Sequence, residues 1–382
     1  MAESEKKRLK VNHEGSVGSG TMNEVRSKHL GWTKRQGYIL TGGGKADELY
    51  TADRGFPFQE TELPHHHLMQ GKTHSVFEQW RSTAPPCSAV CGVWNRTLFV
   101  GGWDHTSDTD EIAFNIQTHN LFIDMRIPRS RSELLSGTFA SLQDLGPEEL
   151  RLYARQHIFA GFSYPSTEDG RLLCTRHHCI DWNFVGSPRT RPNKWWIEAK
   201  EDGEVWKEYS YAKDNYGQHY YFERWEKVGT SNLPRLALRT VSTASRDGII
   251  VAVGDHFNYI LAREMSGAEK GYQNETSTVD LVDAAVTAGD LTTARSYLSI
   301  EGGHGKVSND WAIESSISPW DEGKVLWELN GSSGVVVEGD SIENCSITWS
   351  GLKWSIYDCS FQDVLELKKY VRKSGSVPTS KL

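Results

Sequence analysis

The stretch N-L-F-I-D-M-R-I, residues 120–127, decides the fold class, because polar and apolar side chains alternate along it. On an extended chain its apolar residues fall on one side, and its charged pair, Asp124 and Arg126, falls on the other. A period of two is typical of a β-strand with one buried face. Pro128 follows directly and favours an end to the strand. The stretch therefore predicts a strand with a charged face.

Similar runs recur along the chain at nearly regular spacing, separated by Gly, Asp, Asn and Pro. This spacing indicates antiparallel barrels or sandwiches. Strands are predicted at 93–100, 120–127, 172–184, 194–199, 204–211, 216–228, 235–242, 248–263, 297–300, 311–316, 324–329, 334–338 and 346–358. Helices are predicted after Gly146-Pro147, within 279–298 and at 361–372. The chain is expected to be mainly β, with two antiparallel β-barrels and a few short helices.

Length and composition indicate two domains. The 382 residues exceed what one hydrophobic core usually serves. Only 37% of the residues are hydrophobic, but 14 Trp, 14 Tyr and 13 Phe bury large areas each. We predict a flexible, partly disordered N-terminal arm over 1–86 and a first barrel with an inserted helix over 87–230. A second barrel follows over 231–360, and a C-terminal helix with an exposed targeting tail over 361–382.

Charge and hydropathy exclude several classes of protein. The net charge of −8 argues against nucleic acid as a partner, because phosphate binding needs clustered Lys and Arg. No apolar run approaches the roughly 20 residues that span a bilayer. The Gly-rich patches 42–44 and 302–305 lack the following lysine of a phosphate loop, so nucleotide binding is not expected. We expect no cofactor and no membrane span.

Short motifs carry a resemblance to a known family. They lie at 114–118, 122–128, 159–161, 174–182, 222–225, 247–254, 311–313, 319–323 and 351–354. Together they resemble a calycin-like family of fungal and bacterial two-barrel proteins that includes a yeast interactor of a casein-kinase-one homologue. The resemblance implies two successive lipocalin-like antiparallel barrels, and it implies no settled activity.

The last three residues, Ser380, Lys381 and Leu382, match the address read by the peroxisomal import receptor. Residues 373–379 before them have little apolar surface and contain a proline, which favours an accessible tail. We therefore expect the import receptor as a partner and the peroxisomal matrix as the location.

Two pairs of residues are candidates for catalysis. Asp124 and Arg126 point the same way, and strand alternation likewise places His177 and Asp181 on one face of another strand. If these faces meet inside one barrel, His177 and Asp181 can exchange protons and Arg126 can bind an oxyanion. The alternative is a structural network that fastens the barrel end to the predicted helix.

A metal site is not expected. Cys174, His177, His178 and Cys179 form the densest group of possible ligands. Strand alternation divides them between two faces, whereas zinc needs ligands that converge. Buried free cysteines beside hydrogen-bonded histidines are the simpler interpretation.

Four further residues are candidates for ligand binding. His256 and Asn258 share one side of a strand that is predicted to face the interior of the second barrel. Trp182 and Trp225 are expected to line a cavity, although most strand tryptophans pack in cores. A lone strand histidine is also commonly a core or surface residue.

Three functions remain open. The first is a peroxisomal lipocalin-like protein that binds a small apolar or aromatic molecule in a barrel cavity. The second is a cofactor-independent isomerase, cyclase or lyase that uses side-chain acid–base chemistry. The third is a protein-interaction module.

Overall fold

The computed structural model describes residues 88–101, 106–108, 111–129, 139–182, 193–200, 203–211, 219, 221–229, 233–240, 246–263 and 278–372. The predicted N-terminal arm and the predicted import signal, Ser380 to Leu382, lie outside these residues. Both remain predictions.

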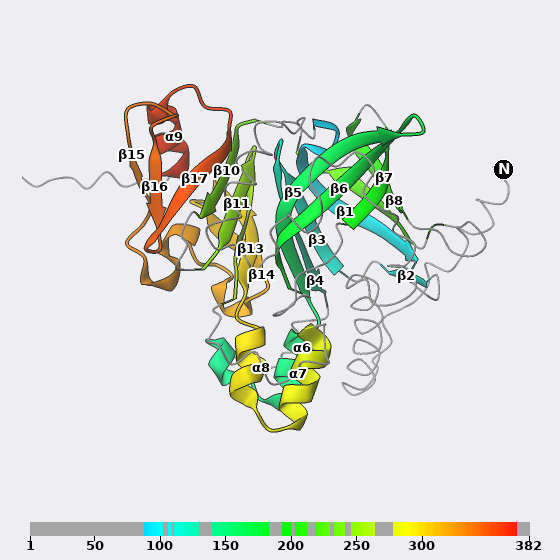
Figure 1. Cartoon of the computed structure of the whole chain (residues 1–382). Helices are drawn as coiled ribbons and strands as arrows, with labels where there is room; N and C mark the ends of the chain where they lie inside the picture. The colour runs from blue at the N-terminus through cyan, green and yellow to red at the C-terminus, as the bar shows by residue number, and fades with distance from the viewer. Residues whose placement is uncertain are drawn as a thin grey trace, which may run out of the picture.

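Eight antiparallel strands of the first sheet close into a barrel (Figure 1). The sheet contains β1 (Gly92–Gly101), β2 (Thr106–Asp108), β3 (Glu111–Gln117), β4 (Leu121–Pro128), β5 (His157–Glu168), β6 (Arg171–Asp181), β7 (Asn193–Lys200), β8 (Val205–Ser210) and β9 (Tyr221–Lys227). β3 to β9 follow one another in space, and β9 returns to pair with β1. β2 pairs only with the far end of β1. The predicted mainly β fold and its first barrel are confirmed.

The second sheet also has eight antiparallel strands, in the order β14-β13-β12-β11-β10-β17-β16-β15. They are β10 (Arg235–Thr240), β11 (Gly248–Val253), β12 (His256–Leu261), β13 (Glu301–Lys306), β14 (Ala312–Ser316), β15 (Val336–Glu338), β16 (Ser346–Trp349) and β17 (Leu352–Cys359). Within the described ranges no ladder joins β14 to β15, so this sheet has two edges there. A second closed barrel and a lipocalin fold remain predictions.

The helical segments are η2 (Ser88–Val90), η3 (Leu142–Asp144), α6 (Pro147–Tyr153), α7 (Thr278–Thr287), α8 (Leu291–Tyr297), η5 (Pro319–Asp321), η6 (Leu326–Gly331) and α9 (Val364–Val371). Helices α6, α7 and α8 lie below the two sheets, and α9 lies at the top beside the second sheet (Figure 1). α6 begins at Pro147, because the fixed φ of proline suits the first position of a helix. The Asp290 side chain accepts a hydrogen bond from the Thr293 backbone at the start of α8. The predicted helices are confirmed.

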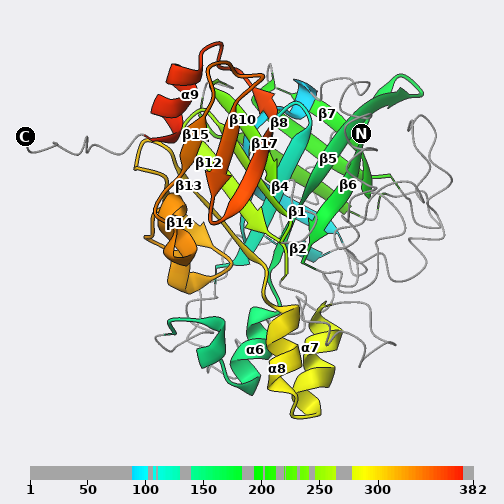
Figure 2. The same ribbon diagram turned by 60° about the vertical axis from the view of Figure 1, so that its left-hand side comes forward.

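The outer wall of the barrel packs on one face of the second sheet, and the two views agree on this arrangement (Figures 1 and 2). β3, β4 and β5 supply the barrel side of this contact, and β11, β12 and β13 supply most of the other side. The buried residues include Leu121, Ile123, Met125, Ile127, Ile158, Ala160, Ala237, Ile249, Val251, Val253 and Ile260. Because burial of apolar area drives this contact, the two sheets share one core.

Each sheet has a further core on its other face. Inside the barrel this core contains Val90, Trp94, Ala113, Cys174, Trp195, Ile197, Trp206 and Trp225. On the second sheet it contains large side chains such as Phe257, Trp311, Trp327, Trp349 and Trp354. The predicted role of the aromatic residues as packing groups is confirmed, since these tryptophans are nearly or fully buried.

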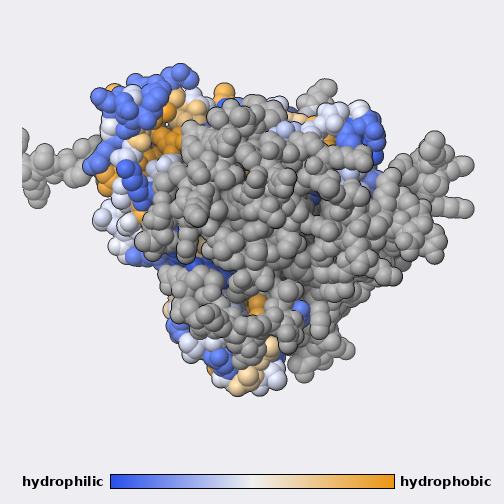
Figure 3. All heavy atoms as spheres, viewed as in Figure 1, coloured by the Kyte–Doolittle hydropathy of each residue, from blue (hydrophilic) through white to orange (hydrophobic). Residues whose placement is uncertain are grey.

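α9 packs beside the second sheet on its outer side (Figure 2). Leu367, Tyr370 and Val371 are buried there, and the Trp311 indole donates to the Tyr370 carbonyl at 3.1 Å. The surface around α9 is mostly hydrophilic, with a hydrophobic strip beside it (Figure 3). The helix therefore shows the amphipathic pattern that its sequence predicts.

Four predicted strand runs are wrong in detail, and one of them, 346–358, is a hairpin of β16 and β17. Residues 324–329 form η6 rather than a strand for most of their length, and residues 297–300 precede β13. The run 248–263 is a hairpin, because the chain turns at Gly254 with a φ of 61°. A left-handed φ of this kind favours glycine.

Ile123→Ala tests whether the two sheets unfold together. We expect the free energy of unfolding to fall by about 2–5 kcal/mol, because the substitution leaves a cavity in the shared core. Denaturant unfolding followed by tryptophan fluorescence measures this loss, and the transition should stay single. Leu365→Ala, at a side chain that is 61% exposed, is the control and should change little. Two separated transitions would contradict the shared core.

Candidate functional site

Asp124 and Arg126 form an ion pair inside the barrel, with Arg126 Nε donating to Asp124 Oδ1 at 2.9 Å. Both residues are buried, at 0% and 4% exposure. The apolar side chains of β4 pack outward on the second sheet, so strand alternation turns this charged pair inward. The predicted ion pair is confirmed.

The pair belongs to a larger network that the sequence did not predict. Glu223 accepts hydrogen bonds from Arg126 at 3.2 Å and from Arg96 at 2.9 Å. Arg96 also pairs with Glu111. Burial alone lowers the pKa of Arg126, but the carboxylates of Asp124 and Glu223 more than offset it, so the pKa is raised well above its usual value. The guanidinium groups therefore remain charged inside the barrel.

Aromatic rings surround this network. The Arg126 guanidinium lies 5.5 Å from the Phe159 ring centroid, and that of Arg176 lies 4.1 Å from the Phe122 centroid. Such cation–π contacts stabilise a desolvated guanidinium. Trp225, a predicted ligand-binding residue, donates its indole N–H to Glu223 at 3.0 Å. Trp225 is thus a member of the network.

Asp181 pairs with His178, with 2.5 Å between His178 Nδ1 and Asp181 Oδ2. The sequence instead predicts that Asp181 shares a face with His177. The reason for this difference is an irregularity in the β5–β6 ladder: Gly161 opposes His178, Ala160 opposes Ile180, and Cys179 is the extra residue. A bulge of this kind exchanges the faces beyond it. The side chain of His177 lies outside the described part.

The two cysteines of β6, Cys174 and Cys179, lie on opposite faces of the strand. Cys174 belongs to the core inside the barrel, and Cys179 belongs to the core shared with the second sheet. Burial raises the pKa of the Cys179 thiol to about 12. Across the described residues, no three His, Cys, Asp or Glu side chains gather as metal ligands. The described helices include none long and apolar enough to cross a membrane.

Trp182 fastens the barrel to the helices. It is fully buried, and its indole donates to the Ala154 carbonyl at 2.9 Å. Its own carbonyl accepts hydrogen bonds from Arg263 and Thr278 of the second half. Instead of lining a barrel cavity as predicted, Trp182 holds three parts of the fold together.

His256 and Asn258 lie between the two sheets, so their predicted position inside a second barrel is wrong. Asn258 Nδ2 donates to the Ile123 carbonyl of β4 at 3.2 Å. His304 Nδ1 lies 2.8 Å from Asn258 Oδ1, and His304 Nε2 lies 3.3 Å from His256 Nδ1. Phe114 stacks on His304 with ring centroids 3.9 Å apart. These residues form a polar chain across the contact.

The hydrogen bonds of this chain fix the proton positions. Because Asn258 donates through Nδ2, its Oδ1 must accept, and His304 donates from Nδ1. His304 Nε2 then carries a lone pair and accepts from His256. Burial, followed by the charges of His256 and Lys306, lowers the pKa of His304 to about 3. His304 is therefore neutral at ordinary pH.

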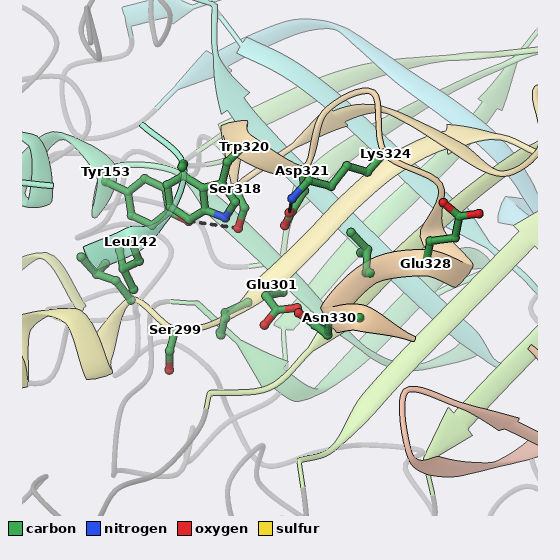
Figure 4. Close-up of a pocket in the computed structure, with 15 residues that line it drawn as sticks. Leu142, Tyr153, Ser299, Glu301, Ser318, Trp320, Asp321, Lys324, Glu328 and Asn330 are labelled. Atoms are coloured by element: carbon green, nitrogen blue, oxygen red, sulfur yellow. Dashed lines mark hydrogen bonds and ion pairs between the residues drawn. The ribbon is translucent and has the colours of Figure 1, made fainter. Parts of the chain in front are cut away.

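A pocket of about 510 Å³ lies where the helices meet the second sheet (Figure 4). It is formed by α6, the segment between α8 and β13, and the two segments η5 and η6. Its walls include Leu142, Tyr153, Leu298, Ile300, Trp320 and Leu329. Tyr153 and Trp320 stack with ring centroids 5.6 Å apart and planes 15° apart. The pocket therefore has a flat aromatic wall.

Polar groups line the rest of the pocket (Figure 4). The hydroxyl oxygens of Tyr153 and Ser318 are 3.3 Å apart. Lys324 Nζ donates to Asp321 Oδ1 at 3.1 Å. Burial raises the pKa of Asp321, and Lys324 offsets only part of the effect. Asp321 is thus a buried acid beside two hydroxyl groups.

The sequence pattern did not single out these pocket residues. Pro319, Trp320 and Asp321 lie within one of the resemblance motifs, but that motif was interpreted only for fold. Tyr153 follows from the helical spacing of the predicted helix, which marks it as a core residue. The sequence signal for this site is an acid next to a tryptophan, Trp320-Asp321, in a turn region between Pro319 and Gly323.

Comparisons with known proteins return no family model and no curated protein that matches the chain. Among solved structures, the chain is similar to the crystal structure of an uncharacterized protein from Saccharomyces cerevisiae, with 12% sequence identity and a TM-score of 0.39. The match covers 70% of this chain and 98% of that chain. The calycin-like family remains a prediction.

Arg126→Met tests the charge network. We expect a loss of about 3–5 kcal/mol in the free energy of unfolding, because Asp124 and Glu223 lose a buried partner. The double variant Asp124→Leu/Arg126→Met should lose less than the sum of the two single variants. Denaturant unfolding of all four proteins gives the coupling energy. Strictly additive losses would show that the pair does not interact.

His304 predicts a dependence of stability on pH. The unfolded histidine binds a proton below about pH 6.5, whereas folded His304 stays neutral down to about pH 3. Stability should therefore fall as pH drops from 7 toward 3, by up to about 1.4 kcal/mol per pH unit from this group. Unfolding midpoints of the wild type and His304→Gln, measured from pH 7 to 5, should converge as pH falls. Parallel curves would contradict this assignment.

Proposed function

We propose that this protein binds a small planar molecule in the pocket between the helices and the second sheet. The observation that supports this proposal is a pocket of about 510 Å³ with the Tyr153–Trp320 stack on one wall. Ligand sites are commonly about 300–1,000 Å³ and combine apolar walls with a few polar groups. A flat ring fits against stacked aromatic side chains.

The proposed ligand is aromatic, as the sequence predicts, but the proposed site lies at the helices instead of in a barrel cavity. The charge network and four tryptophans occupy the inside of the first barrel across its described strands. Large aromatic side chains cover the corresponding face of the second sheet. This packing supports the pocket at the helices over a barrel cavity.

The polar groups of the pocket favour a ligand with hydrogen-bonding substituents. Asp321 and Lys324 offer one acceptor and one donor, and the hydroxyl groups of Tyr153 and Ser318 offer both. Delivery to the peroxisome by the predicted import signal is a part of the proposal that rests on sequence alone. The interaction module remains an untested alternative.

Trp320→Ala tests the binding proposal. Mass spectrometry of small molecules released from natively purified protein should find a planar ligand in the wild type. The variant should lose it or bind it at least about tenfold more weakly, because the ring contact is removed. Trp320→Phe should retain binding, and Leu365→Ala should behave as the wild type. Equal retention in Trp320→Ala and wild type would place the ligand elsewhere.

A further inference from the structure

Two acids of the pocket wall, Glu301 and Asp321, are held differently. Glu301 has both oxygens engaged: Arg246 donates to Oε1 at 2.5 Å, and Asn330 donates to Oε2 at 3.0 Å. Asp321 is held through Oδ1 by Lys324, and no described residue bonds its Oδ2. Asp321 is only 7% exposed. It therefore offers a desolvated carboxylate oxygen to a ligand, whereas Glu301 has a structural role.

Arg246 confirms that structural role for Glu301. Besides Glu301, its guanidinium donates to the carbonyls of Ala262 and Ser299. Arg246 thereby joins the end of β12 to the segment before β13. Its donors thus serve contacts within the protein.

Two hydroxyl groups accompany Asp321. Tyr153 and Ser318 share one hydrogen bond at 3.3 Å, in which either oxygen can be the donor. When Tyr153 is the donor, the Ser318 hydroxyl keeps its own proton, which it can donate to another acceptor. Both side chains are nearly buried, where a hydrogen bond to developing negative charge is stronger than in water.

We propose that this pocket catalyses keto–enol proton transfer on planar, enolisable carbonyl compounds, with Asp321 as the proton carrier. The hydroxyl pair of Tyr153 and Ser318 donates to the carbonyl oxygen. This inference rests on the proposed binding function and names its substrate class and its chemistry.

The step is balanced within the pocket. Asp321 Oδ2 takes a proton from the carbon next to the carbonyl, and the electrons of that C–H bond form the C=C bond. The carbonyl π electrons move onto oxygen, which the hydroxyl pair stabilises by hydrogen bonding. Asp321 then transfers the same proton to that oxygen, which gives the enol and returns Asp321 to the carboxylate form; the reverse order gives the ketone. No electrons leave the substrate, and no co-reactant is needed.

The environment of Asp321 suits it both to accept a proton and to donate one. Burial raises its pKa from the ordinary value, which moves it toward the neutral range where a group can both accept and donate a proton. Lys324 keeps the carboxylate oriented through Oδ1. The Lys324 side chain is itself 53% exposed, so it can also meet a carboxylate on the substrate.

Phenylpyruvate is the probe that combines a flat ring, an enolisable carbon and a carboxylate. Loss of enol absorbance measures its tautomerisation, and solvent deuterium incorporation at the carbon measures the proton transfer directly. Asp321→Asn should lower kcat about 100-fold or more with binding retained. Tyr153→Phe/Ser318→Ala should also lower kcat. Glu338→Gln, at an exposed carboxylate outside the pocket, is the control and should leave kcat unchanged.

The outcomes separate the two proposals. If phenylpyruvate binds with a dependence on Trp320 but Asp321→Asn tautomerises it as fast as wild type, proton transfer is overturned and binding stands. If phenylpyruvate does not bind, the substrate class is wrong, and this inference fails with it. If the wild type also releases no ligand after native purification, the proposed function fails as well. A catalytic loss in Asp321→Asn at unchanged unfolding midpoint supports the inference.

Discussion

The contact between the barrel wall and the second sheet is the constraint on which the other features depend. Because Ile123 and Met125 face outward into this contact, Asp124 and Arg126 have to face the barrel interior. A barrel with charges inside has to pair each of them, since an unpaired buried charge costs several kcal/mol. The network around Glu223 meets that requirement, and it fills space that an apolar ligand would otherwise occupy.

The sequence predicts features that depend on local pattern and misses those that depend on packing across sheets. The ion pair on β4 follows from alternation, and α6 follows from Pro147 at its start. β5 shows no alternation, because its first seven residues are buried on both faces. The bulge at Cys179 has no local signal, so the partner of Asp181 was assigned incorrectly. The pocket is formed by segments far apart in the chain, which no periodicity connects.

β13 illustrates how tertiary packing overrides local preference. Its sequence, E-G-G-H-G-K, reads as a loop, yet it pairs with β12 and β14 inside the second sheet. A Cβ atom on Gly302 would collide with Ile158 of the barrel, and one on Gly303 would lie 2.9 Å from the Ser315 carbonyl. The glycines therefore let the strand approach its neighbours closely, and they leave His304 as the side chain that reaches Asn258.

The same close approach explains why the pocket lies at the helices. Where the two sheets meet, glycines and apolar side chains pack closely, and paired charges and tryptophans occupy the described part of the barrel interior. The pocket is lined by α6, η5 and η6, which come from segments far apart in the chain and meet beside the second sheet. Asp321, which an apolar core would exclude, is tolerated there because Lys324 pairs with it.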